Sequence, residues 1–159
     1  MPELQPLRAD HADAVLSFER DNRAFFAQSV PDRGDTYFEE FAARHAANLA
    51  EQTEGTALMH VLVTAEGEII GRFNLYDPAD GSAELGFRMA EHATGRGLAT
   101  AAVRRLFTLA REEYALTRVT AAAEPENRAS RAVLLRTGFH PTGTTTRSGR
   151  PCVEYARTL

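Results

Sequence analysis

The stretch EHATGRGLAT, residues 91–100, places two glycines and several small residues directly after the apolar run SAELGFRMA (82–90). This pattern predicts a strand, a glycine-rich turn and then a helix over residues 97–114. Such a turn presents backbone N–H groups at the positive end of a helix, which suits a diphosphate without a cationic side chain. In the alternative interpretation, the glycines only permit a tight turn at the helix N-terminus.

Two familiar phosphate-binding motifs do not fit this stretch. The dinucleotide motif G-x-G-x-x-G requires a third glycine at position 100, where Thr100 stands, and it belongs to an early βαβ unit. The P-loop requires a lysine, but all 18 cationic residues are arginines. The absence of lysine also excludes pyridoxal-phosphate chemistry, which needs a lysine Schiff base.

Composition predicts one soluble α/β domain over residues 1–159. Hydrophobic residues make up 43% of the chain and charged residues 25%. A net charge of −4 argues against a broad nucleic-acid surface, and no stretch is apolar enough to span a bilayer. The N-terminus lacks a signal-peptide pattern, so we expect a cytoplasmic protein without nucleic-acid or membrane partners. Cys152 is the single cysteine, and no residue spacing indicates a metal site.

The hydrophobic pattern predicts the element order β-α-α-β-β-β-α-β-α-β-β, with a mixed, mostly antiparallel sheet. Asp10 is the expected N-cap of the first helix and Asn127 that of the last, while 21–35 is expected to be irregular. The predicted strands are 3–8, 57–64, 68–76, 82–90 and 117–123, followed by a closing hairpin around 148–151; the predicted helices are 10–20, 38–54, 97–114 and 127–138.

A second motif, NRASRAVLLRTGF (127–139), follows the glycine-rich stretch after one helix and one strand. Together the two motifs resemble the Gcn5-related N-acetyltransferase superfamily, in particular its branch of ribosomal-protein alanine N-acetyltransferases. The first motif matches [QR]-x-x-G-x-[GA], although His92 stands where glutamine or arginine is usual. The second is similar to N-x-x-S-x-x-[VL] followed by G-F.

The resemblance implies acetyl-CoA as the donor substrate. In that superfamily the fourth and fifth strands splay apart, and the pantetheine lies between them like an added strand. The diphosphate is then expected on the N–H groups of the glycine-rich turn. The implied cofactor-binding residues are Phe87, Arg88, Met89, Gly95, Arg96, Gly97, Leu98, Ala99, Thr100 and Asn127.

The resemblance also implies direct attack of an amine on the thioester, with the backbone N–H near Met89 as oxyanion donor. Glu84 is the first candidate for the base, because its strand faces the acetyl group, and Asp77 is the reserve. A solvated or ion-paired Glu84 without a catalytic role is at least equally compatible with the sequence. A bulge at Gly86 would change which side chains share a face of this strand.

The general acid departs from the superfamily pattern. Leu134 stands where many members have a tyrosine, whereas the ribosomal branch has a serine that matches Ser130. Ser130 is therefore the candidate partner of the leaving sulfur, and Asn127 is expected to contact the pantetheine. Alternatively, both residues simply begin a helix.

The acceptor pocket is expected to involve residues 22–33, the helix behind them and residues 144–151. The branch suggests a protein N-terminal α-amine as acceptor, and the alternatives are a small-molecule amine such as an amino acid, polyamine or antibiotic. A catalytically idle acetyl-CoA-binding module and a dinucleotide-binding protein also remain open. Both a monomer and a homodimer are compatible with the sequence.

Overall fold

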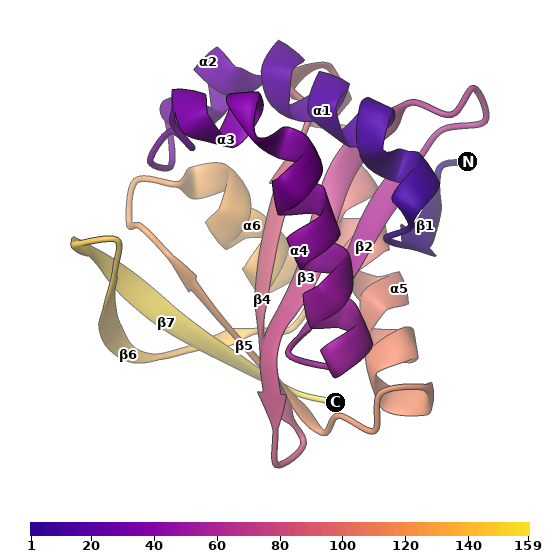
Figure 1. Ribbon diagram of the computed structural model, residues 1–159. Coiled ribbons are helices and arrows are strands. Elements are labelled where there is room, and N and C mark those ends of the chain that lie inside the picture. The colour runs from indigo at the N-terminus through magenta and orange to yellow at the C-terminus, as the bar shows by residue number, and fades with distance from the viewer.

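The chain folds around one seven-stranded sheet with the strand order β1-β2-β3-β4-β5-β7-β6. The computed structural model describes all residues 1–159 (Figure 1). Every neighbouring pair of strands is antiparallel except β4 and β5, so the predicted mixed, mostly antiparallel sheet is confirmed. The strands are β1 Glu3–Pro6, β2 Ala57–Val63, β3 Ile69–Ala79, β4 Ser82–Met89, β5 Arg118–Ala123, β6 His140–Arg147 and β7 Arg150–Thr158.

Six α-helices and two 3₁₀ turns complete the fold. The helices are α1 Ala12–Asp21, α2 Arg23–Ala27, α3 Asp35–Glu39, α4 Phe41–Glu54, α5 Leu98–Glu112 and α6 Arg128–Arg136; the turns are Ala9–His11 and Glu91–Ala93. None of these helices is both long enough and apolar enough to cross a membrane.

The prediction that Asp10 caps the first helix is wrong. A 3₁₀ turn over Ala9–His11 precedes α1, and Asp10 accepts a hydrogen bond from Arg8 Nε at 3.0 Å. The His11 side chain makes the local capping hydrogen bond instead, because its Nδ1 accepts from the Arg8 backbone N–H at 2.9 Å.

The segment 21–35 is more ordered than the sequence predicted. It contains α2, and the following turn is fixed by Arg23, which bonds Asp32 at 2.8 and 2.9 Å and Asp35 at 2.8 Å. Likewise, the helix predicted over 38–54 divides into α3 and α4. Helices of five residues are too short to show a 3.6-residue period, so their sequences look irregular.

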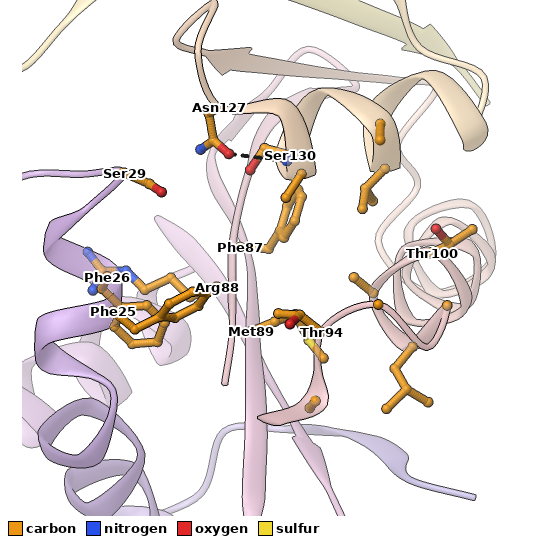
Figure 2. A pocket seen from close by; sticks show the side chains of 18 of the residues that line it. Phe25, Phe26, Ser29, Phe87, Arg88, Met89, Thr94, Thr100, Asn127 and Ser130 are labelled. Carbon is orange, nitrogen blue, oxygen red and sulfur yellow. Dashed lines mark hydrogen bonds between the residues drawn. The ribbon is translucent and has the colours of Figure 1, made fainter. Parts of the chain in front are cut away.

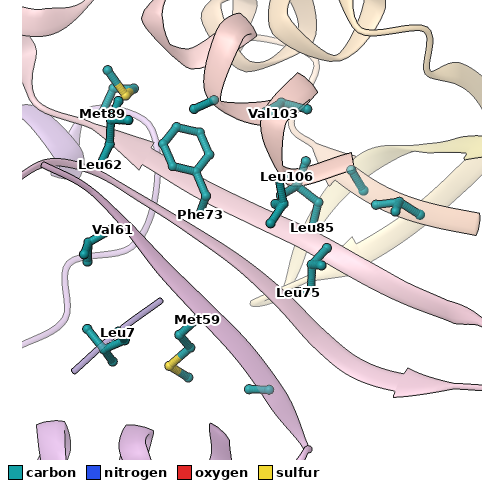
Figure 3. Packing of buried hydrophobic residues seen from close by; sticks show 14 of the residues in the cluster. Leu7, Met59, Val61, Leu62, Phe73, Leu75, Leu85, Met89, Val103 and Leu106 are labelled. Atoms are coloured by element: carbon teal, nitrogen blue, oxygen red, sulfur yellow. The ribbon is translucent and has the colours of Figure 1, made fainter. Parts of the chain in front are cut away.

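Helices α1 to α4 cover one face of the sheet and α5 and α6 the other (Figure 1). We call these the front and back faces. Met59 and Val61 lie with Leu7 on the front face, whereas Phe73, Leu75 and Leu85 pack against α5 on the back face (Figure 3). Successive strand residues point to opposite faces, so two apolar layers form on one sheet.

The pairing of β4 with β5 is short. It comprises only Ser82↔Arg118, Ala83↔Val119 and Glu84↔Thr120. Beyond these positions β4 pairs only with β3, and β5 only with β7. The predicted splaying of the fourth and fifth strands is therefore confirmed, while the β3–β4 register runs through Gly86 without a bulge.

The structure predicts a pH dependence of stability from the buried His60. Its Nδ1 lies 3.1 Å from the Phe73 carbonyl oxygen and its Nε2 lies 2.6 Å from the Tyr114 hydroxyl, which fits a neutral ring that donates from Nδ1 and accepts at Nε2. Burial lowers the pKa of His60 to about 4. An unfolded histidine has a pKa of about 6.5, so the unfolded state binds the proton more readily between these values.

We therefore expect stability to be fully present above pH 6.5 and to decline as the pH falls toward 4. The His60 contribution to the free energy of unfolding should fall by about 3 kcal/mol across that range. Chemical denaturation at a series of pH values measures this decline. The His60→Gln variant should lose that part of the slope, and an unchanged slope in the variant would contradict the assignment.

Candidate functional site

A cavity of about 410 Å³ opens beside the free part of β4, at the N-termini of α5 and α6. Phe25 and Phe26 of α2 form its opposite wall, as Figure 2 shows. We call it the first cavity. Most of the cofactor-binding residues predicted from the sequence line it: Phe87, Arg88, Met89, Gly95, Gly97, Leu98, Ala99, Thr100 and Asn127, but not Arg96.

The turn before α5 holds a row of unused hydrogen-bond donors. None of the backbone N–H groups of residues 95–100 donates a hydrogen bond within the protein; the first that does is that of Ala101, to the Gly97 carbonyl at 3.1 Å. Gly97 is the N-cap of α5, and no side chain caps this helix. Unpaired N–H groups at the positive end of a helix form an anion-binding site.

The glycines of this turn are required by backbone conformation. Gly95 and Gly97 both have φ of +74°, a region that residues with a Cβ rarely adopt. A Cβ at either position would meet no protein atom within 4 Å. Within the protein itself, conformation rather than crowding therefore selects glycine.

The free edge of β4 also carries unused backbone groups. The Ala90 N–H donates to the Ile70 carbonyl on β3 at 2.9 Å. Because bonded and non-bonded positions alternate along an antiparallel pair, Arg88 also turns its backbone toward β3, while Phe87 and Met89 turn theirs toward the gap beside β5. The geometry thus favours Phe87 and Met89, and not the Arg88 backbone, as partners for an extended ligand.

Asn127 and Ser130 lie together at the start of α6 (Figure 2). The Asn127 Oδ1 accepts from the Ser130 backbone N–H at 3.3 Å, which confirms Asn127 as N-cap. The Asn127 side-chain NH₂ and the Ser130 hydroxyl donate no hydrogen bond within the protein. Both side chains line the first cavity, so their donors are available to a ligand there.

A second cavity of about 280 Å³ lies in the gap between β4 and β5 and opens toward the front face. It meets the first cavity at Val30, Phe87, Arg88, Asn127 and Ser130, which line both. The buried Leu134, at the position where the superfamily often has a tyrosine, lines the second cavity and offers no acidic proton. Of the predicted acceptor segments, 22–33 contributes Val30 and Arg33, and 144–151 contributes nothing.

A buried charge cluster, which the sequence analysis missed, borders the second cavity. Glu19, only 1% exposed, accepts hydrogen bonds from Arg33 at 2.8 and 3.1 Å, from Arg72 at 2.8 Å and from Arg88 at 3.3 Å. Burial raises the pKa of Glu19, but the bonds and charges of the arginines outweigh it, and the pKa lies below its usual range. The available signal was a glutamate next to Phe18 on the apolar side of α1.

The predicted bases lie outside both cavities. Glu84 shares the front face with Gly86 and Arg88, but its carboxylate forms an ion pair with Arg147 at 2.5 Å. Asp77 is exposed at the irregular end of β3, and His92 lies 3.5 Å from Glu68. No aspartate, glutamate or histidine lines either cavity, so the role of Glu84 as base has no direct geometric support.

The fold and this site are those expected of an acyltransferase that uses a CoA ester, and comparison with known proteins identifies the family. The acetyltransferase (GNAT) domain matches residues 3–140, and the chain belongs to this family. It is accordingly an acetyl-CoA-dependent N-acetyltransferase. No group of three or more histidine, cysteine, aspartate or glutamate side chains is arranged to hold a metal ion.

Individual relatives agree with this assignment. YdaF of Bacillus subtilis strain 168, provisionally named a ribosomal N-acetyltransferase, is 36% identical over 72% of this chain and 61% of its own length. RimJ of Mycobacterium smegmatis, solved with a CoA disulfide, is 27% identical with a TM-score of 0.87, covering 98% of this chain and 80% of its own. Ribosomal-protein-S5-alanine acetyltransferase of Vibrio fischeri shares the fold, with a TM-score of 0.90 at 20% identity over 99% and 92% of the chains.

Substitutions of Asn127 separate its structural role from ligand binding. Asn127→Ala removes the cap and should lower the free energy of unfolding by about 1 kcal/mol, whereas Asn127→Ser keeps a capping oxygen and should cost at most about half of that. Both remove the amide NH₂ and should raise the KM for acetyl-CoA by about 3- to 10-fold. Denaturation and steady-state kinetics measure the two effects. A wild-type KM in Asn127→Ser would show that the amide makes no contact with the donor.

Proposed function

We propose that this enzyme transfers the acetyl group of acetyl-CoA to the N-terminal α-amine of a protein. The observation that carries the reaction is the meeting of two cavities at the gap between β4 and β5. One cavity is lined by unused backbone donors, and the other opens on the front face. The acceptor class is supported by the ribosomal N-acetyltransferase name of YdaF.

The first cavity suits acetyl-CoA by the groups that it offers. The N–H groups of residues 95–100 would bind the diphosphate at the N-terminus of α5. The Met89 backbone and the Phe87 carbonyl oxygen would pair with the pantetheine amides as a neighbouring strand does, since β5 has turned away from β4. Acetyl-CoA supplies a thioester, whose carbonyl carbon is the target of the free amine.

Phe87 is the proposed oxyanion donor, because it lines both cavities, whereas Met89, the residue favoured by the sequence, lines only the first. The Phe87 N–H faces the gap and has no partner strand there, so it can donate to the carbonyl oxygen as negative charge develops. The Ser130 hydroxyl, which lines both cavities, would donate to the leaving sulfur. A thiolate is a stable leaving group, so a weak donor suffices at this position.

A base must remove a proton from the acceptor ammonium, but no aspartate, glutamate or histidine lines either cavity. Glu84 is the carboxylate on the same face of β4, two residues from Gly86 of the second cavity. We propose that Glu84 takes the proton through water and that Arg147 restrains its carboxylate. The ion pair between them lies near the protein surface and is therefore weak enough to reorganise.

The proposed function is tested by the release of CoA thiol and by intact mass. Acetyl-CoA is incubated with peptides that represent ribosomal-protein N-termini, and in parallel with amino acids, polyamines and aminoglycosides. We expect acetylation of the peptide α-amine, with the highest kcat/KM among these acceptors. Preference for a small-molecule amine would replace the acceptor class. Acetyl-CoA binding without thiol release for any amine would indicate an idle binding module. Thermal stabilisation by NAD but not by acetyl-CoA would indicate a dinucleotide-binding protein.

Gly97→Ala tests the diphosphate site against a matched control. Gly55, the C-cap of α4, also has a positive φ, and a Cβ there likewise meets no atom within 4 Å. Both alanine variants should lose about 1 kcal/mol of stability from backbone strain. Only Gly97→Ala should raise the KM for acetyl-CoA, by about 10-fold or more. The strained turn would no longer direct the N–H groups of residues 95–100 toward one diphosphate. Equal KM values in the two variants would place the diphosphate elsewhere.

A further inference from the structure

We propose that the acceptor carries a carboxylate close to the amine that is acetylated, and that Arg33, Arg72 and Arg88 bind this carboxylate in the second cavity. The proposal rests on the acetyl transfer proposed above and adds a substrate class to it. The carboxylate could be an acidic side chain near a protein N-terminus or the α-carboxylate of a free amino acid.

The charges around the second cavity do not balance. Three guanidiniums surround the single carboxylate of Glu19, which leaves a net charge of +2. No aspartate or glutamate lines the cavity to offset it. Buried charge without a partner is costly, so a cavity bordered by this excess favours an anion.

The arginines also retain unused donors. Arg72 is 6% exposed in its side chain, and only its Nη1 is bonded, to Glu19 and to the Tyr37 hydroxyl. Arg88 donates only from Nη1, and Arg33 keeps Nη1 free. These nitrogens are accessible to solvent, because His45 Nδ1 is the only fully buried side-chain nitrogen or oxygen that lacks a hydrogen-bond partner. They can therefore donate to a ligand in the cavity.

Glu19 does not neutralise the three arginines equally. It makes two hydrogen bonds with Arg33 and a single, longer one with Arg88. Burial and the charges of Arg33 and Arg72 lower the pKa of Arg88, while bonding to Glu19 outweighs burial and raises the pKa of Arg33. Arg88 is thus the arginine that Glu19 neutralises least, and it lies where the two cavities meet.

The donor substrate gives no reason for this charge. Its diphosphate belongs at residues 95–100 of the first cavity, which are absent from the second. Its 3′-phosphate lies on the opposite side of that diphosphate from the thioester, and its pantetheine and thioester are uncharged. An acceptor with only an ammonium group would be repelled by a net charge of +2. A carboxylate beside the amine reverses that repulsion, and guanidiniums are suited to bind it in paired hydrogen bonds.

Isosteric acceptors test the proposal. Peptides beginning Ala-Asp or Ala-Glu are compared with Ala-Asn and Ala-Gln, and free alanine is compared with alaninamide, which lacks the α-carboxylate. We expect the acidic member of a pair to have a kcat/KM at least about 10-fold higher. Preference in the peptides alone identifies the acidic side chain as the source of the carboxylate, and preference for alanine over alaninamide identifies the α-carboxylate of a small amino-acid acceptor.

Two variants attribute the preference to the cluster. Arg33 lines the second cavity but not the first. Arg33→Gln should reduce the preference for the acidic acceptor to about threefold or less, and Arg33→Lys should retain part of that preference. Arg20→Gln removes the same charge from the exposed side of α1 and should leave it unchanged. The dissociation constant for acetyl-CoA verifies that each variant is folded.

Equal kcat/KM for acidic and amide acceptors in the wild type would overturn the proposal while leaving the acetyl transfer intact. So would a preference that survives Arg33→Gln. If no amine is acetylated, the transfer itself fails, and calorimetry with N-acetylalanine and N-acetylalaninamide then tests the carboxylate site by itself. Binding of the former that depends on Arg33 supports a carboxylate site, and equal binding of both rejects it.

Discussion

The site depends on the point at which β4 and β5 cease to pair. Three residue pairs join them, and after Glu84↔Thr120 each strand continues with a different neighbour. A strand edge inside a sheet is normally satisfied by the next strand, so the separation leaves the Phe87 and Met89 backbone open to a ligand. It also makes room for both cavities. The pairing of β5 with β7 holds β5 in its divergent course.

Much of the fold could be predicted from the sequence, because the long elements carry clear periodicity. The strands of the sheet and α5 follow alternating and 3.6-residue patterns, and the predicted element order is confirmed apart from the added short helices. The errors lie where local signals compete. Asp10 is an ordinary N-cap residue, but the neighbouring His11 captured the available N–H. Five-residue helices such as α2 are set by tertiary contacts, which no window of sequence contains.

The two halves of the site differ in the same way. The first cavity could be predicted because two contiguous motifs supply it, largely through backbone groups near Gly97 and Asn127. The Glu19 cluster could not be predicted, because its arginines are distant in the chain. Arg72 lies 53 positions and Arg88 69 positions after Glu19. Which charged side chains meet across such distances is decided by strand register. The assignment of Glu84 as base came from its strand alone and did not anticipate Arg147, which comes from the hairpin of β6 and β7.

The use of arginine in the second cavity has a chemical consequence. Arginine stays protonated at every pH at which a protein is folded, so its guanidinium has no free electron pair for attack on an acyl group. A lysine in the same place could lose its proton on burial and become a nucleophile within reach of an activated acetyl group. Such an amine would be converted to a neutral amide, and the charge would be lost. The chain contains no lysine, so the positive field at this site is immune to self-modification.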